Sequence, residues 1–335
     1  MLYLTFPTQD ILNTYFLKVK DSIIQNINDN RKNAFLNLEA KSFLINELEN
    51  IIKANPLELK QLNVEFFQKL NKGILKYKHY LSYIQYIDAE SKDLTLFQKT
   101  FLFFYRRQLR KIENIFDYEE ILSKSKSKSY WLAKQINTNT CIYCNRLYAN
   151  VIEVGNGSND AKRIARPFFD HWYAKSKFPI LALSFYNLIP SCSVCNSSIK
   201  GSVEFDIDTH IHPYMKEVQN NFKFSYKHES LTNHNVIIRD YNSLSDKTKK
   251  TIQDFKIQEV YDAHSDKELK DLLDLRYKYS DNYIVELFQN TFKNISISDD
   301  EIYRLIFGVE IKEEDYHKRS FNKFKHDIIE ELRSK

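Results

Sequence analysis

The chain has 335 residues, of which 43% are hydrophobic and 28% charged, with a net charge of +5 and a pI of about 8.7. This balance excludes a disordered chain, and the length leaves room for two or three domains with a buried core. No apolar run is long enough to cross a membrane, and the N-terminus lacks the form of a signal peptide, so we expect a cytoplasmic protein. The weak basic excess permits nucleic acid binding without requiring it.

Glycine and proline gather in the middle of the sequence. Three of the five glycines and four of the six prolines lie between positions 155 and 213. Because these residues interrupt helices, we expect a small module over residues 137–215, between two mainly helical regions at 1–136 and 216–335. The predicted fold class is therefore mainly α with a small central α+β module.

The N-terminal region carries apolar residues at helical spacing. The clearest stripe runs from Ile11 to Ile27. Further helices are expected over 42–54, 57–71 and 94–114, with Asn55-Pro56 stopping the first of these. A polar stretch in which Lys124, Lys126 and Lys128 alternate with serines is expected to be a linker or loop.

All four cysteines fall in the central module as two CxxC pairs, Cys141-Ile-Tyr-Cys144 and Cys192-Ser-Val-Cys195. Four thiolates at this spacing make a closed tetrahedral zinc site, the arrangement of a structural metal. Two disulfides, or four ordinary buried cysteines, are the alternatives. Zinc is favoured because paired thiols in a cytoplasmic protein more often bind metal than oxidise.

Polar residues of catalytic type lie between and beside the two pairs. A hairpin over residues 147–169, with its turn at 155–157, is expected to end at Asp170-His171. Asn187 stands before Leu-Ile-Pro-Ser and the second pair, and Asn196 follows that pair at the start of a short helix. Taken singly, Asp170 could be a turn or helix-cap residue, and either asparagine could satisfy loop backbone.

Taken in order, these elements and the following Lys200-Gly201 resemble the HNH endonucleases of the zinc-stapled ββα-metal type. The resemblance implies hydrolysis of phosphodiester bonds, with His171 as the general base that activates water. It implies that Asp170 and Asn196 hold one catalytic Mg²⁺, for which Mn²⁺ can substitute. It also implies that Asn187 braces the loop and orients His171.

Further candidates surround this motif. Tyr173, Lys175 and Lys200 are expected to contact the substrate, and so is His212. His210 and His212 could add a metal ligand or a substrate contact, although a lone histidine is usually structural.

The C-terminal region is expected to hold a second small hairpin, formed by residues 222–226 and 236–238. Helices are expected over 247–255, 267–275, 283–292 and 299–307. Ser298 with Glu301 forms a capping box for the last of these, and Gly308 fits its C-terminal stop. The basic and aromatic tail, with Lys318, Arg319 and Lys323, is a candidate surface for nucleic acid or a partner, though a docked terminal helix has a similar pattern.

The run 181–192 and the later His212-Pro-Tyr also resemble the HNH nuclease subunit of bacterial Septu-type anti-phage systems. In that family the nuclease acts with an ABC-type ATPase, sometimes together with a retron. The resemblance implies such a partner and a nucleic acid substrate, with DNA favoured over RNA. This chain has no GxxxxGK[ST] loop with which to hydrolyse ATP itself. Two alternatives stay open: a stand-alone restriction or homing HNH endonuclease, and a non-catalytic nucleic-acid-binding protein whose zinc module is only structural.

Overall fold

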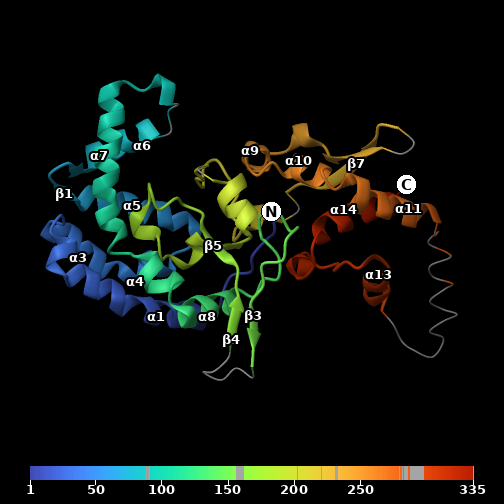
Figure 1. The fold of residues 1–335 in the computed structure, drawn as a ribbon, viewed down its shortest axis with the longest axis horizontal. Helices are drawn as coiled ribbons and strands as arrows, with labels where there is room; N and C mark the ends of the chain where they lie inside the picture. The colour runs from blue at the N-terminus through green and yellow to red at the C-terminus, as the bar shows by residue number, and fades with distance from the viewer. Residues whose placement is uncertain are drawn as a thin grey trace.

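The computed structural model describes all residues except 88, 90, 156–161, 202, 220, 231–232, 279, 281, 283–285, 287–297 and 335. The fold is mainly α, with four two-stranded antiparallel sheets in this described part, as the sequence predicts. A helical N-terminal lobe and a C-terminal lobe lie on either side of the central module (Figure 1). The turn expected at 155–157 and the helix expected over 283–292 lie outside the described residues, apart from Gly155 and Glu286.

The N-terminal lobe begins with helix α1 (Gln9–Asn28), whose apolar stripe is buried as predicted. Its other regular elements are α2 (Asn30–Asn33), α3 (Leu38–Asn46), α4 (Leu48–Lys53), α5 (Pro56–Lys69), β1 (Asn71–Lys72), β2 (Leu75–Lys76), α6 (Tyr77–Ile87), η1 (Ser91–Asp93) and α7 (Leu96–Glu113). The single helix expected over 42–54 is instead two helices, interrupted at Glu47, which departs from helical geometry. Asn55 follows the end of α4 and also starts α5, because its side chain forms a capping box at the N-terminus of that helix.

The polar stretch expected as a linker is a helix. After the π-helical turn η2 (Glu119–Ser123), helix α8 (Lys126–Ile136) contains two of the three lysines assigned to a loop. Tyr130, Leu132 and Ala133 form the buried face of this helix. Their tertiary packing outweighs the weak helix preference of the serines. The prediction of a loop was wrong because it considered only the polar residues 124–128 and not the apolar residues that follow them in the same helix.

The central module contains two short hairpins. In the first, β3 (Ile152–Val154) pairs with β4 (Lys162–Ala165) and projects from the body (Figure 1). In the second, β5 (Phe168–His171) pairs with β6 (Leu188–Ser191), so that His171 lies opposite Leu188. Between these two strands run the single turns η3 (Pro179–Leu181) and η4 (Phe185–Asn187), and β6 leads into the π-helical turn η5 (Val194–Ile199). The second hairpin and η5 therefore form a strand, strand and helix unit around the candidate residues.

The C-terminal lobe holds the second predicted hairpin and a set of short helices. Its elements are η6 (Lys216–Val218), β7 (Phe224–His228), β8 (His234–Ile238), η7 (Tyr241–Ser243), α9 (Asp246–Asp254), α10 (Ile257–Asp262), η8 (Ser265–Leu269), α11 (Lys270–Lys278), α13 (Asp299–Phe307), η9 (Glu313–Lys318) and α14 (Asn322–Ser334). The capping box at Ser298 and the left-handed Gly308 bound α13 as predicted. Helix α14 contacts β7 and buries Phe324, Ile328 and Ile329, so the tail is a docked helix.

The basic residues of that tail are engaged within the chain. Lys318 pairs with Asp315 at 2.8 Å and Arg319 with Glu310 at 2.7 Å, while Lys323 is buried and pairs with Asp327 at 3.1 Å. Because each positive charge already faces a carboxylate, the tail offers less free positive charge than its sequence suggests.

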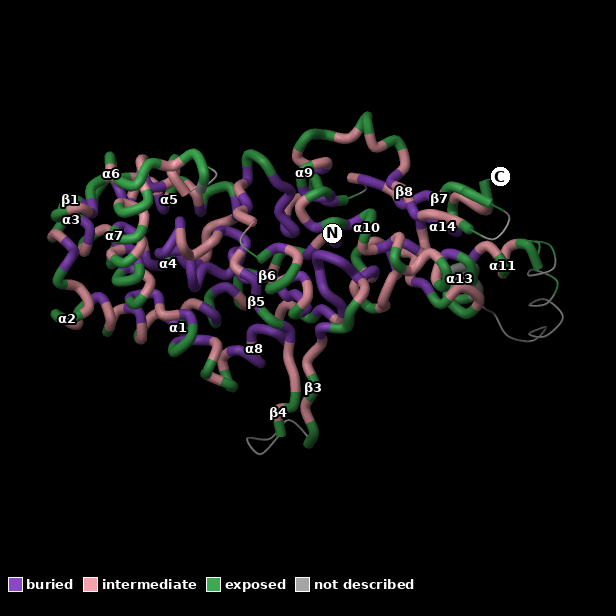
Figure 2. Tube along the Cα trace, turned by 45° about the horizontal axis from the view of Figure 1, so that its top comes forward, coloured by how far each residue is buried: buried purple, intermediate pink, exposed green. Residues whose placement is uncertain are grey.

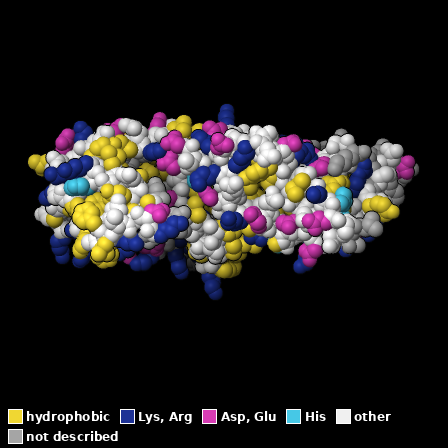
Figure 3. All heavy atoms as spheres, turned by 90° about the horizontal axis from the view of Figure 1, so that it is seen from above, with side chains coloured by type: hydrophobic (Ala, Val, Ile, Leu, Met, Phe, Trp, Pro, Cys, Tyr) yellow, Lys and Arg dark blue, Asp and Glu magenta, His cyan; other side chains and the backbone are white. Residues whose placement is uncertain are grey.

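Buried residues continue from one lobe through the module to the other (Figure 2). The chain start joins this core, because Leu2 N donates to Ile142 O at 2.8 Å and Leu4 N to Pro213 O at 2.9 Å. On the face shown in Figure 3, Lys and Arg side chains are interspersed with Asp and Glu along the whole length. Within the described residues, no helix combines the length and the apolar character needed to span a membrane.

Candidate metal centre and catalytic cleft

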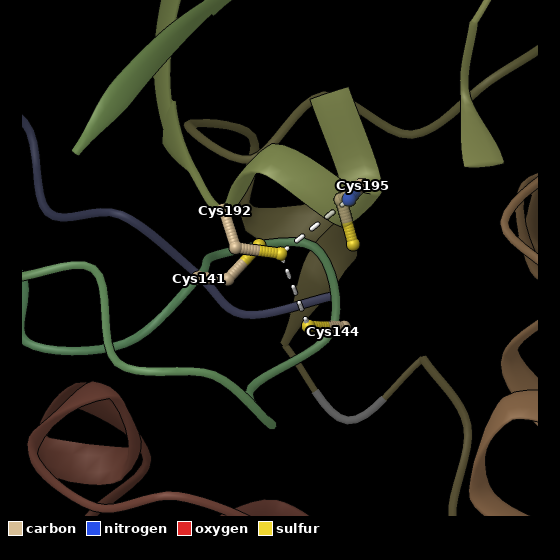
Figure 4. Close-up of side chains that lie close together, drawn as sticks. All are labelled: Cys141, Cys144, Cys192 and Cys195. Carbon is tan, nitrogen blue, oxygen red and sulfur yellow. Dashed lines mark hydrogen bonds between the residues drawn. The ribbon is translucent and has the colours of Figure 1, made fainter. Parts of the chain in front are cut away.

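The four cysteines converge on one point. Cys141 and Cys144 lie on one loop, Cys192 follows β6, and Cys195 lies in η5 (Figure 4). All four sulfur atoms lie within 4.8 Å of one another, and Cys144 Sγ is 4.0 Å from Cys192 Sγ. Four thiolates bound at about 2.3 Å around a tetrahedral zinc stand about 3.8 Å apart, whereas a disulfide needs about 2.05 Å. The cluster therefore fits a metal such as zinc and does not fit disulfides.

The cysteine environment suits a closed structural site. The four side chains are buried, and backbone N–H groups of Arg146 and Cys195 approach Cys144 Sγ and Cys192 Sγ at 3.5 and 3.4 Å. Burial raises the pKa of the Cys141 thiol well above its usual range. A divalent cation would offset that penalty by replacing the proton, so metal binding at this site would be coupled to folding.

Asn145 fastens the first cysteine loop to the C-terminal segment. It has a left-handed backbone with φ of 49° and is 2% exposed. Its Nδ2 lies 2.9 Å from Thr140 Oγ1, 3.0 Å from Tyr316 O and 2.9 Å from Arg319 O. Its Oδ1 accepts from Lys323 N at 3.0 Å. No motif in the sequence marks this asparagine, yet it ties the first cysteine loop to residues more than 170 positions away.

Asp170 lies in β5 and is almost fully buried. Its Oδ2 accepts a hydrogen bond from Tyr143 OH at 2.6 Å and one from Lys200 Nζ at 2.7 Å. Tyr143 stands between the first two cysteines, so the metal loop itself orients this carboxylate. The other oxygen, Oδ1, accepts no hydrogen bond from the described residues, which leaves it for a hard cation.

His171 ends β5 with its ring edge-on to Tyr118, the two ring centroids 4.6 Å apart. Its Nε2 lies 2.9 Å from Ala182 O. Because a carbonyl can only accept, Nε2 carries the hydrogen and the lone pair of the neutral ring is on Nδ1. Burial, reinforced by the positive charge of Lys175, lowers the His171 pKa to about 4, so the ring is neutral at pH 7.

Asn187 braces the loop between β5 and β6. It is fully buried; its Oδ1 accepts from Tyr173 N at 2.6 Å, and its Nδ2 donates to Tyr173 O and Leu181 O at 3.1 and 2.9 Å. Leu181 directly precedes Ala182, whose carbonyl holds His171. The asparagine therefore fixes the loop that fixes the histidine.

Asp170 and His171 line a cleft of about 1010 Å³ together with Asn196 from η5. Asn196 is partly exposed, and its side chain makes no hydrogen bond with the described residues. We call this the His171 cleft. Its other lining residues that carry polar or aromatic groups include Arg106, Tyr118, Lys126, Tyr130, Arg166, Lys175, Lys200 and Glu204. The sequence-predicted candidates Lys175 and Lys200 are among them.

Two predicted substrate residues lie elsewhere. Tyr173 and His212 are fully buried and do not line the His171 cleft. Tyr173 OH donates to Pro56 O at 3.3 Å, and His212 packs against Trp172 with ring centroids 4.5 Å apart. His210 Nε2 lies 2.8 Å from Asp254 Oδ2. In this structure all three contribute to packing and internal hydrogen bonding.

Arg166 is a cleft residue that the sequence did not single out. Its guanidinium donates to Pro167 O at 2.8 Å and to Ser123 O at 3.2 Å, and it lies 5.6 Å from the Phe169 ring. These neutral partners hold the group in place without cancelling its charge. Its position two residues before β5 was the only signal in the sequence.

Comparison of the chain with protein-family models, with curated proteins and with solved structures finds no match.

Proposed function

We propose that this protein is a metal-dependent HNH-type endonuclease that hydrolyses phosphodiester bonds in nucleic acid. One observation carries the proposal: a neutral, half-buried histidine and two oxygen ligand candidates, Asp170 and Asn196, line one basic cleft. A binding module that uses zinc only for folding has no need of this combination. The sequence resemblance to HNH enzymes points to the same residues.

The chemistry follows from what each group is able to do. His171 Nδ1, with its lone pair, takes a proton from the attacking water, and the Nε2 hydrogen bond to Ala182 holds the ring during that transfer. Asp170 Oδ1 and the Asn196 amide oxygen would hold a Mg²⁺, which takes few protein ligands and stabilises negative charge on a phosphate. Arg166 and Lys175 supply positive charge along the cleft for the phosphates on either side.

Asp170 also has a competing role. Its Oδ2 belongs to the buried pair with Lys200, whose Nζ additionally donates to His171 O at 2.6 Å. Only Oδ1 therefore serves as a ligand, and Lys200 is placed to position Asp170 and His171 as much as to contact the substrate. This arrangement favours a weakly held, exchangeable cation.

The proposal is tested with supercoiled plasmid, single-stranded DNA and RNA as substrates, each with and without Mg²⁺. Removing a general base typically costs a factor of about 10² or more. His171→Ala is expected to keep its zinc and its fold and to lose cleavage on that scale, and Asn196→Ala is expected to need more Mg²⁺. The matched control is His228→Ala, an exposed histidine in β7 outside the cleft, which should cut like wild type. Full activity of His171→Ala would show that this assignment is wrong.

We further propose that the nuclease acts as an effector of a bacterial anti-phage system together with an ABC-type ATPase, as its resemblance to the Septu family implies. The exposed apolar face of α7 supports a protein partner, because Leu96, Phe97 and Phe103 are 82%, 79% and 69% exposed. Co-expression of this chain with an ATPase encoded beside it should give one complex on a sizing column. The double substitution Phe97→Asp and Phe103→Asp should prevent that complex from forming. If the chain elutes alone and cuts at full rate, the stand-alone nuclease takes the place of this proposal.

A further inference from the structure

A second basic pocket lies in the N-terminal lobe, away from the His171 cleft. It has a volume of about 530 Å³, within the range of small-molecule sites, and shares no lining residue with the cleft. It is formed where α2 and the β1–β2 turn face the last turns of α7. We call it the α7 pocket.

The charge in the α7 pocket is all of one sign. Four of its lining residues are basic, namely Arg31, Lys32, Lys72 and Lys111, and the described lining includes no carboxylate. Two of the lysines bond neutral oxygens, Lys32 Nζ to Asn26 Oδ1 at 2.8 Å and Lys72 Nζ to Ala34 O at 2.6 Å. These bonds hold the ammonium groups in place and leave their charge uncompensated. A concentration of positive charge of this kind attracts phosphate.

The nearby carboxylates are used elsewhere. Asp29 caps α2 by accepting from Arg31 N at 2.9 Å and does not line the pocket. Glu113, on the same helix as Lys111, forms an ion pair with Arg106 toward the other side of α7. Arg31 and Lys111 themselves form no ion pair with any described residue, so both are free to bind an anion.

The rest of the lining suits a planar group with polar edges. Phe35, Ile74 and Leu75 supply an apolar floor, and Phe35 is 9% exposed. Gln108 and Asn114 line the wall, and their side-chain amides bond nothing in the described part of the chain. Carboxamides pair with the donor and acceptor edges of bases, while an apolar surface accepts a base face.

We infer that the α7 pocket binds a nucleotide, with the phosphate groups on its basic rim and the base over Phe35 and Ile74. The nucleotide is either a free mononucleotide or the phosphorylated end of a nucleic acid strand, since both present the same chemistry. This inference does not rest on the nuclease proposal, because the two sites are separate.

Calorimetric titration of the full chain, in the His171→Ala background and without added Mg²⁺, tests the inference. The probes are dAMP, ATP, inorganic phosphate, adenosine, and one oligonucleotide with or without a 5′-phosphate. Lys111→Glu should weaken binding of the phosphorylated probes at least tenfold. The control Lys99→Glu makes the same charge change on the same helix outside the pocket and should leave binding unchanged.

Each outcome decides the inference. Binding of dAMP or ATP that is sensitive to Lys111→Glu supports it with a free nucleotide as ligand, and the same sensitivity for the 5′-phosphorylated strand alone supports it with a strand end. Equal losses in Lys111→Glu and Lys99→Glu overturn it, because the attraction is then unspecific. Binding of inorganic phosphate as tight as that of dAMP, or no saturable binding at all, overturns it as well.

Discussion

Replacing Asn145 by glycine removes the fastening of the first metal loop while keeping its backbone conformation. The side chain supplies two N–H donors and one acceptor to buried partners, so at least three hydrogen bonds are lost. Each contributes about 1 kcal/mol, and buried backbone groups left without partners cost more, so we expect Asn145→Gly to destabilise the fold by about 3–5 kcal/mol. Asn145→Ala should be worse by about 1 kcal/mol, because alanine resists a φ of 49°.

Guanidinium unfolding followed by circular dichroism at fixed excess zinc measures these differences. Asn137 provides the matched control, since it has the same left-handed backbone with φ of 52° but is exposed and has no side-chain hydrogen bond in the described structure. Asn137→Gly should change the free energy of unfolding by less than about 0.5 kcal/mol. An Asn145→Gly variant that is no less stable than Asn137→Gly would show that the Asn145 hydrogen bonds do not stabilise the fold.

Three further substitutions test the cysteine cluster, the buried ion pair of Lys200 with Asp170, and the buried side chain of His212. Elemental analysis should find about one zinc per chain in wild type, whereas Cys192→Ser should lack it and should be insoluble or far less stable, because metal binding supplies folding free energy. Lys200→Met should cost about 3–5 kcal/mol in denaturant unfolding by leaving Asp170 buried without its cation, and adding Asp170→Asn should restore part of that loss. Burial lowers the pKa of His212 to about 3, below its ordinary value of about 6.5. Below pH 6.5 the unfolded state therefore binds a proton at this histidine that the folded state does not. This difference alone should lower the free energy of unfolding by about 2 kcal/mol between pH 7 and pH 5. His212→Gln should flatten that part of the pH profile, and an unchanged slope would show that another group is responsible.

The four-cysteine cluster could be predicted from the sequence because the two CxxC spacings are local patterns. Two CxxC spacings specify two loops, and all that remained was for the fold to bring Cys141 and Cys192 together, which it does. The helical class followed from periodic apolar residues for the same reason. Whether the candidate catalytic residues act as the HNH resemblance implies remains a prediction.

Contacts between distant segments could not be predicted in this way. Nothing next to Asn145 indicates that its amide bonds Tyr316 and Arg319, because that partnership depends on where α14 docks. The same cause explains α8, whose serines and lysines resemble a linker until the surface beneath Tyr130 is known. It also explains the tail, where Lys323 looks exposed in sequence and is buried beside Asp327.

The fastening at Asn145 also bears on how the protein is made. The loop that carries Cys141 and Cys144 leaves the ribosome long before residues 316–323, which lie 171 to 178 positions further along. At about 5–20 residues per second, the loop waits roughly 10–35 s for its partners. During that interval the nascent chain is able to gather its four thiols but not to secure the first loop. A polypeptide that stops before residue 316 therefore lacks the partners of Asn145, even when it contains all four cysteines. Synthesis of residues 316–323 is then a condition for a rigid cysteine cluster.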